Sequence, residues 1–77
     1  MKESKTEDNE THRLTPQQIK VLILIAEGLQ NKEIAFRMGL SVSTVKQHVS
    51  GIMLRLDIRT RTGVVTKAQK LGLIDLQ

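Results

Sequence analysis

The sequence predicts an all-α fold, a compact four-helix domain with a helix-turn-helix motif, preceded by a disordered amino-terminal arm. Three observations support this prediction. Apolar residues recur at helical spacing in four segments, capping residues precede these segments, and only a few residues separate one segment from the next. A chain of 77 residues has room for one domain with one modest core. We expect residues 1–13 to form the arm or linker and residues 14–77 to form the domain.

The first helix is expected to begin after Thr15. With Pro16 at the first helical position and Gln18 three residues after the cap, Thr15 can form a capping box. Gly28 is suited to end the helix. One apolar face is expected at i, i+3, i+4 and i+7, formed by Ile19, Leu22, Ile23 and Ala26.

Two further helices are expected on either side of a short turn, Gly39-Leu40-Ser41. The earlier one has Asn31 as its N-cap, a body over residues 32–38, and Gly39 as the left-handed residue that ends it. Its buried face is expected to comprise Ile34, Ala35 and Met38. The later one is expected over about residues 42–56 behind Ser41. Its apolar stripe comprises Val42, Val45, Val49, Ile52 and Leu56.

A fourth helix is expected from Thr60 to Gly72. Its apolar positions are Val64, Val65, Ala68 and Leu71. The β-branched run VLILIA at 21–26 is also compatible with a buried strand. Its length, the capping residues and Gly28 favour the helix, so the sequence predicts a helical domain with no strands.

Charge and composition restrict the function classes. Residues 1–13 hold three basic and four acidic residues, whereas residues 14–77 hold nine basic and four acidic ones, which favours a polyanionic partner. Phe36 is the only aromatic residue, and single-strand binders stack bases on several. Duplex DNA is therefore the better match.

Other classes find little support in the sequence. Cysteine is absent, and His48 and His12 are the only histidines, so we expect no metal or cofactor. The longest apolar run is far shorter than the roughly 20 residues that cross a bilayer, so we expect a cytoplasmic protein that is nucleoid-associated when bound. No nucleophile–base pair or phosphate-binding glycine loop is recognisable, so we expect no enzyme.

The expected third helix divides into three faces at about 100° per residue. One face is the apolar stripe. A second carries slim polar side chains, namely Ser43, Lys46, Gln47 and Ser50. A third carries donors suited to phosphates, namely Thr44, His48 and Arg55. A recognition helix needs this division, because slim polar groups enter the major groove while flanking groups hold the backbone. A solvated polar surface explains the same pattern.

Several segments together resemble a known family. They are LTPQQ at 14–18, IAEGLQNKEIA at 25–35, GLS at 39–41, TVKQHVSGIMLRL at 44–56 and RTRTGVV at 59–65. These segments are similar to the LuxR/GerE-type (NarL-like) helix-turn-helix DNA-binding domain of bacterial transcription regulators. The resemblance implies a four-helix domain whose second and third helices form the helix-turn-helix unit.

The resemblance also implies residue roles. Lys46, Gln47 and Ser50 match positions that face bases in the major groove, and Ser43 lies on the same face. Positions that approach phosphates are matched by Asn31, Lys32, Thr44, His48 and Arg61. The last helix of the family commonly forms the dimer contact, which points to Val64, Lys67, Ala68 and Leu71.

Some residues depart from the family pattern. Gln18 replaces a usual Glu, and Asp57 stands where Gly is typical, although Asp tolerates a left-handed conformation at some cost. Gly63 replaces a capping side chain and is expected to weaken the start of the fourth helix. Gly51 either admits a close backbone approach or is simply tolerated. Ile23 replaces a usual polar residue, as a docking point or as an ordinary exposed side chain.

Two side chains keep alternative roles. Thr44 acts on DNA or in the first turn of its own helix. His48 contacts a phosphate or packs against the domain.

The leading hypothesis is a sequence-specific duplex-DNA-binding regulator, either stand-alone or the carboxy-terminal output domain of a response regulator. It would bind paired half-sites as a homodimer, with a regulatory domain or RNA polymerase as further partners. The runner-up is a protein-interaction adaptor that uses the fold without contacting bases. The promoter-binding region of a sigma factor has similar helices, but the resemblance extends through the fourth helix and argues against it.

Overall fold

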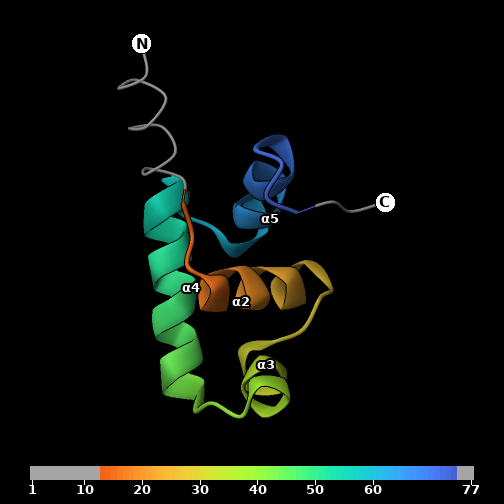
Figure 1. Ribbon diagram of the computed structural model, residues 1–77, viewed down its shortest axis with the longest axis vertical. Helices are drawn as coiled ribbons and strands as arrows, with labels where there is room; N and C mark the ends of the chain where they lie inside the picture. Colours follow the sequence, from red (N-terminus) through yellow and green to blue (C-terminus); the bar gives the residue numbers. More distant parts are fainter. Residues whose placement is uncertain (1–12, 75–77) are drawn as a thin grey trace.

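A computed structural model describes residues 13–74, which form four α-helices and no strand. They are α2 (Pro16–Ala26), α3 (Asn31–Met38), α4 (Val42–Leu56) and α5 (Arg61–Lys70) (Figure 1). The all-α prediction is confirmed for this part of the chain. The arm expected over residues 1–13 lies, apart from Arg13, outside the described residues.

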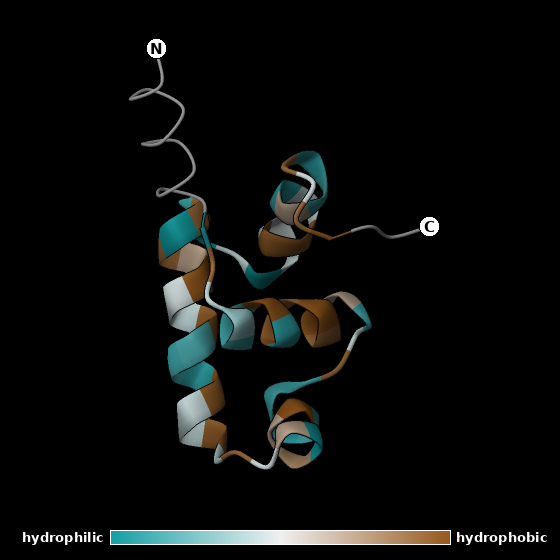
Figure 2. Cartoon of the chain, in the orientation of Figure 1, coloured by the Kyte–Doolittle hydropathy of each residue, from teal (hydrophilic) through white to brown (hydrophobic). Residues whose placement is uncertain are grey.

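The longest helix, α4, runs along one side of the domain, and α2 meets it crosswise between α3 and α5 (Figure 1). α4 contacts each of the other three helices. The side of α4 that faces them is apolar, whereas much of its outer side is polar (Figure 2). The largest fully buried side chains come from all four helices, and they are Val21, Leu22, Ile34, Val45, Ile52, Leu56 and Val64.

The predicted N-terminal starts of three helices are confirmed. At the start of α2, Thr15 Oγ1 accepts from the Gln18 N–H at 3.0 Å and Gln18 Oε1 accepts from the Thr15 N–H at 2.9 Å, which closes the capping box. Ser41 caps α4, and Thr60 caps α5 through the Gly63 N–H at 3.0 Å. These local hydrogen bonds satisfy backbone donors that a helix start leaves unpaired.

The prediction for the start of α3 was wrong. The N-cap is Gln30, and Asn31 is the first residue of the helix. The Gln30 N–H donates to Glu33 Oε1 at 2.8 Å. The side chain of Asn31 has another partner, since Arg61 Nη1 donates to its Oδ1 at 2.6 Å.

Two of the predicted apolar faces need correction. On the predicted face of α2, Leu22 is buried as expected, but Ile23 is 42% exposed. Val21 and Ile25, which were not predicted, are buried as well. Because most of α2 is apolar, its periodicity permits more than one face, and packing against α4 and α3 selects among them. Val42 is 38% exposed in the first turn of α4, while the other four residues of the predicted stripe are buried.

The two interior glycines have neighbours that a side chain would meet. A Cβ on Gly51 would lie 2.7 Å from Nε2 of Gln18, so Gly51 admits the end of the Gln18 side chain rather than a neighbouring backbone. A Cβ on Gly63 would lie 2.9 Å from both Cγ2 of Ile58 and Oγ1 of Thr60. A larger residue at Gly63 would therefore disturb the cap that Thr60 forms. Although glycine was expected to weaken the start of α5, the Thr60 cap is complete.

Asp57 provides a test of backbone strain at the end of α4. It adopts a left-handed conformation with φ 57°, and its negative charge lies at the helix end where the macrodipole disfavours anions. We expect Asp57→Gly to raise the free energy of unfolding by about 0.5–1 kcal/mol, measured by urea denaturation.

Asp57→Asn separates backbone strain from the effect of charge. It removes the charge and keeps a side chain that tolerates this conformation. Asp57→Ala should lower stability. A glycine variant no more stable than the wild type would contradict the strain argument.

Candidate nucleic-acid interface

The turn between α3 and α4 is held by backbone and side-chain hydrogen bonds. Gly39 ends α3 in a left-handed conformation with φ 68°, and the Leu40 N–H donates to the Ala35 carbonyl at 2.9 Å. Leu40 is half-buried against the core. Ser41 Oγ accepts from the Thr44 N–H at 3.0 Å and donates to Thr44 Oγ1 at 2.9 Å. The turn therefore sets where α4 begins relative to α3.

The outer surface of α4 contains the predicted base-facing residues. All four are exposed, while Val45, Val49, Ile52 and Leu56 on the opposite side are 8% exposed or less. We call these four residues the recognition face: Ser43, Lys46, Gln47 and Ser50. No hydrogen bond between described residues uses their side chains, which leaves their polar groups available to a ligand. The apolar side of α4, apart from Val42, and its exposed polar side are confirmed, whereas the contacts with bases and phosphates stay predictions.

Arg61 forms a bridge between the start of α5 and the start of α3. Its Nη1 donates to Asn31 Oδ1 at 2.6 Å, and its Nη2 donates to the Leu29 carbonyl at 2.8 Å. Because the oxygen of the Asn31 amide is used in this contact, the amide N–H donors point to other partners. Sequence analysis assigned Arg61 to phosphate only, and the partner 30 residues away left no local signal.

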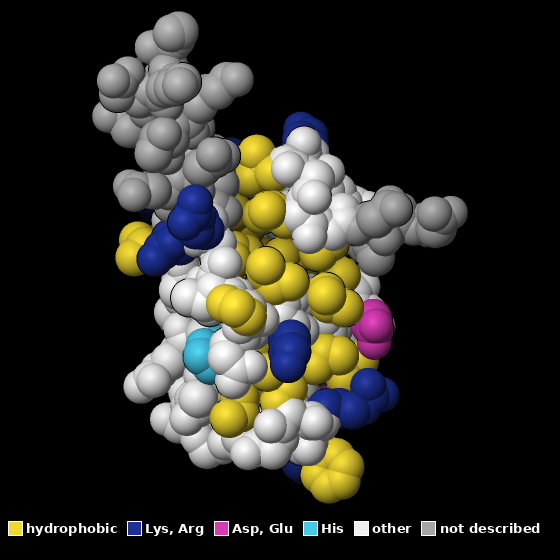
Figure 3. Space-filling model, in the orientation of Figure 1, with side chains coloured by type: hydrophobic (Ala, Val, Ile, Leu, Met, Phe, Trp, Pro, Cys, Tyr) yellow, Lys and Arg dark blue, Asp and Glu magenta, His cyan; other side chains and the backbone are white. Residues whose placement is uncertain are grey.

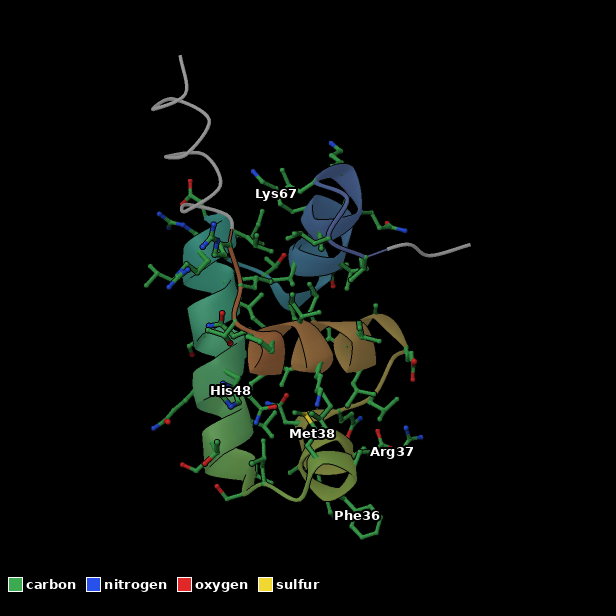
Figure 4. The ribbon with its side chains drawn as sticks, viewed as in Figure 1. Phe36, Arg37, Met38, His48 and Lys67 are labelled. Carbon is green, nitrogen blue, oxygen red and sulfur yellow. The ribbon has the colours of Figure 1, made fainter. Side chains whose placement is uncertain are left out.

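The other predicted phosphate contacts lie in different settings. Lys32 is exposed in the first turn of α3. Thr44 is half-buried and accepts from Ser41, so it acts at least in the first turn of its own helix. His48 is half-buried and projects from α4 (Figure 4). Arg55, on the same predicted face, donates to the backbone carbonyl of Arg13 and thereby ties α4 to the segment before α2.

The predicted dimer residues divide into two groups. Val64 and Ala68 have no exposed surface because they pack into the core of this chain, which removes them from a contact with another copy. Lys67 is half-buried on α5 (Figure 4), and Leu71 is 36% exposed just after α5. Only these two can offer surface to a partner.

Positive charge predominates on the described surface. Residues 13–74 contain ten Lys or Arg residues and three Asp or Glu residues. On the face shown in Figure 3, basic side chains are distributed around exposed apolar ones. No group of three or more His, Cys, Asp or Glu residues among the described residues is arranged to hold a metal ion. None of the described helices has the length and apolar character needed to cross a bilayer.

Two exposed apolar side chains were missed as candidates. Phe36 is 88% exposed and projects from α3 away from α4 (Figure 4). Leu54 is 80% exposed on α4. A helical angle plot would have placed Leu54 on the side of Ser43 and Ser50.

Comparison with known proteins is consistent with this geometry. The family model described as bacterial regulatory proteins, luxR family, matches residues 12–68. The chain belongs to this family. Over 61 residues, it is 41% identical to the response regulator protein VraR of Staphylococcus aureus and to that of Staphylococcus epidermidis. This luxR-family chain spans 29% of the length of these relatives, and the matched part is 79% of its own length.

A solved structure shows the same fold. The response regulator StyR aligns with 90% of this chain and 35% of its own, at 33% sequence identity and a TM-score of 0.74. Family membership makes this a domain of regulatory proteins, with the helix-turn-helix unit formed by α3 and α4.

The Arg61 bridge can be tested through stability. We expect Arg61→Ala to lower the free energy of unfolding by about 1.5–3 kcal/mol, because hydrogen bonds from a charged donor to partly buried partners are lost. Arg61→Lys should retain little of this stabilisation, since an ammonium group lacks the forked guanidinium geometry that contacts two acceptors. Urea denaturation measures both.

Arg59→Ala is the control, because Arg59 is exposed two residues earlier and should change stability by less than about 0.5 kcal/mol. Equal effects at the two arginines would show that the bridge contributes nothing.

Proposed function

We propose that this luxR-family chain binds duplex DNA in a sequence-specific manner as part of a bacterial transcription regulator, with α4 in the major groove. The observation that supports this best is the division of α4. One side supplies core residues, and the other exposes the recognition face with no hydrogen-bond partner among the described residues. The net positive charge of the described residues suits a phosphate backbone.

The recognition face offers groups that match base edges. Lys46 can donate to guanine O6 and N7, and Gln47 can form two hydrogen bonds with adenine N6 and N7. Ser43 and Ser50 are short enough to let the backbone of α4 approach the bases closely. Their hydroxyl groups both donate and accept, so they suit several bases.

The start of α3 is the proposed phosphate contact. Lys32 supplies a charge there, and Asn31 supplies amide donors once its oxygen is engaged by Arg61. Backbone N–H groups at a helix start also favour anions. Thr44 and His48 are proposed to contact the backbone from α4. Arg61 takes part mainly by holding Asn31.

Two copies are proposed to bind paired half-sites as a homodimer. Lys67 and Leu71 retain surface on and after α5 for this contact. Since the chain spans less than a third of its VraR relatives, a regulatory domain that controls dimerisation fits the response-regulator hypothesis, and RNA polymerase is a further proposed partner. The protein is proposed to act on nucleoid DNA in the cytoplasm, with no catalytic activity and no cofactor.

A protein-interaction adaptor is the second candidate. The exposure of Phe36 favours it, because aromatic side chains often anchor protein interfaces. An adaptor would bind its partner equally well without Lys46 and Gln47.

Selection from a random duplex pool tests base recognition. Wild-type protein should enrich a two-fold symmetric motif, and the Lys46→Ala, Gln47→Ala double variant should blur or lose it, since each good side-chain–base pair contributes about 1–3 kcal/mol of discrimination. Where Lys46 also contacts a phosphate, loss of its charge should reduce the slope of log affinity against log salt concentration by about one unit per copy.

The matched control is Gln17→Ala with Lys20→Ala, which removes the same side-chain types from exposed positions on α2. It should enrich the wild-type motif. If the Lys46 and Gln47 variant enriches that motif unchanged, the recognition face is assigned wrongly. Weak, salt-sensitive wild-type binding without any preference would favour the adaptor.

The dimer proposal predicts a specific effect of Leu71→Asp. A charge on this surface should weaken binding to paired half-sites and leave binding to an isolated half-site unchanged, as measured by gel shift. Ile23→Asp is the control, since Ile23 is 42% exposed on α2, outside the proposed interface. Equal loss on one and two half-sites would argue against a contact through Leu71.

A further inference from the structure

An apolar side chain accompanies the recognition face on the outer surface of α4. Leu54 is 80% exposed, whereas Val45, Val49, Ile52 and Leu56 of the same helix are in the core. It follows Ser50 by four residues and Ser43 by eleven. At about 100° per residue, these spacings place Leu54 on the same side of α4 as both serines.

Leu54 also borders an open hollow of about 380 Å³. The hollow is lined by Ser50, Met53, Leu54, Asp57, Ile58 and Arg59. A base-facing residue, Ser50, and an apolar wall therefore belong to one concave surface next to the recognition face. A ligand that reaches Ser50 lies within reach of Leu54.

We propose that Leu54 contacts the 5-methyl group of a thymine, and that α4 thereby selects an A·T pair beyond the pairs contacted by Ser50. This inference rests on the proposed function. The thymine methyl group is the apolar group by which base pairs are distinguished in the major groove. Four residues span about 6 Å of helix, so the thymine is expected beyond the Ser50 contact in the direction in which α4 runs.

Other occupants match the surface less well. Arg59 in the lining of the hollow can donate to a phosphate and the Asp57 carboxylate opposes one, but Leu54 itself has no donor and offers a phosphate nothing. A second copy of this chain seated on Leu54 would also cover Ser50 and keep α4 out of the groove. Thymine is the occupant compatible with the rest of the recognition face.

The test uses the duplex that wild-type protein enriches. Each thymine is replaced in turn by deoxyuridine, which lacks the 5-methyl group and pairs identically. At one position per half-site, the replacement should weaken wild-type binding about fourfold, the factor expected for one buried methyl-sized group. Leu54→Ala should weaken binding to the thymine duplex by a similar factor and should not distinguish thymine from uracil there.

Phe36→Ala is the matched control, because Phe36 is 88% exposed on α3 and points away from α4 (Figure 4). It should keep the full sensitivity to the methyl group. Because Leu54 lies outside the core, Leu54→Ala should fold with wild-type stability, which circular dichroism and urea denaturation check.

The outcomes separate this inference from the proposed function. If wild-type protein enriches a motif but binds every uracil-substituted duplex equally, or if Leu54→Ala keeps the sensitivity, the thymine contact is overturned and DNA recognition stands. If wild-type protein enriches no motif, both are overturned. If Leu54→Ala changes the association state of free protein in sedimentation equilibrium, Leu54 belongs to a contact between copies and the inference is wrong.

Discussion

Burial of one side of α4 is the constraint on which the rest of the structure depends. Val45, Ile52 and Leu56 have no exposed surface, and their helix contacts α2, α3 and α5. Because the angles between side chains on a helix are constant, burying this side turns the recognition face outward. The packing that stabilises the domain therefore also orients the residues proposed to contact DNA. A core change that rotated α4 would alter recognition without touching any base-facing residue.

Two contacts between distant segments connect the other helices to this arrangement. The absence of a side chain on Gly51 lets the Gln18 amide approach α4, so the residue that closes the capping box of α2 also packs at the α2–α4 crossing. Arg61 joins the first turn of α5 to the first turn of α3. In the proposed dimer, the helix that pairs the copies and the helix that contacts phosphate share this link.

Two exposed apolar residues of this small domain contribute little to its folding. Phe36 and Leu54 gain almost nothing from the fold, since each keeps at least 80% of its surface exposed. A chain of this size has little stability to spare, yet its only aromatic ring lies outside the core. For Leu54, beside the recognition face, the proposed contact outside the monomer is DNA.

The sequence by itself determined the four helices, the starts of three of them and the two main sides of α4. Capping by Thr15, Ser41 and Thr60 and the left-handed Gly39 involve neighbours within one turn, so short spacings predict them. The left-handed Asp57 was expected from the family resemblance. The faces of α4 follow from helical angles alone.

Only the tertiary structure decided which apolar surfaces are covered and which distant side chains meet. Periodicity placed Ile23 on a buried face and the family resemblance assigned Val64 and Ala68 to a dimer contact, but the latter two are buried in the core of this chain and Ile23 is exposed. Asn31 was expected to cap α3, whereas in the structure its side-chain oxygen accepts from Arg61, 30 residues later in the chain. The reason is physical: local hydrogen bonds depend on adjacent residues, whereas burial and long-range bridges depend on how whole helices pack.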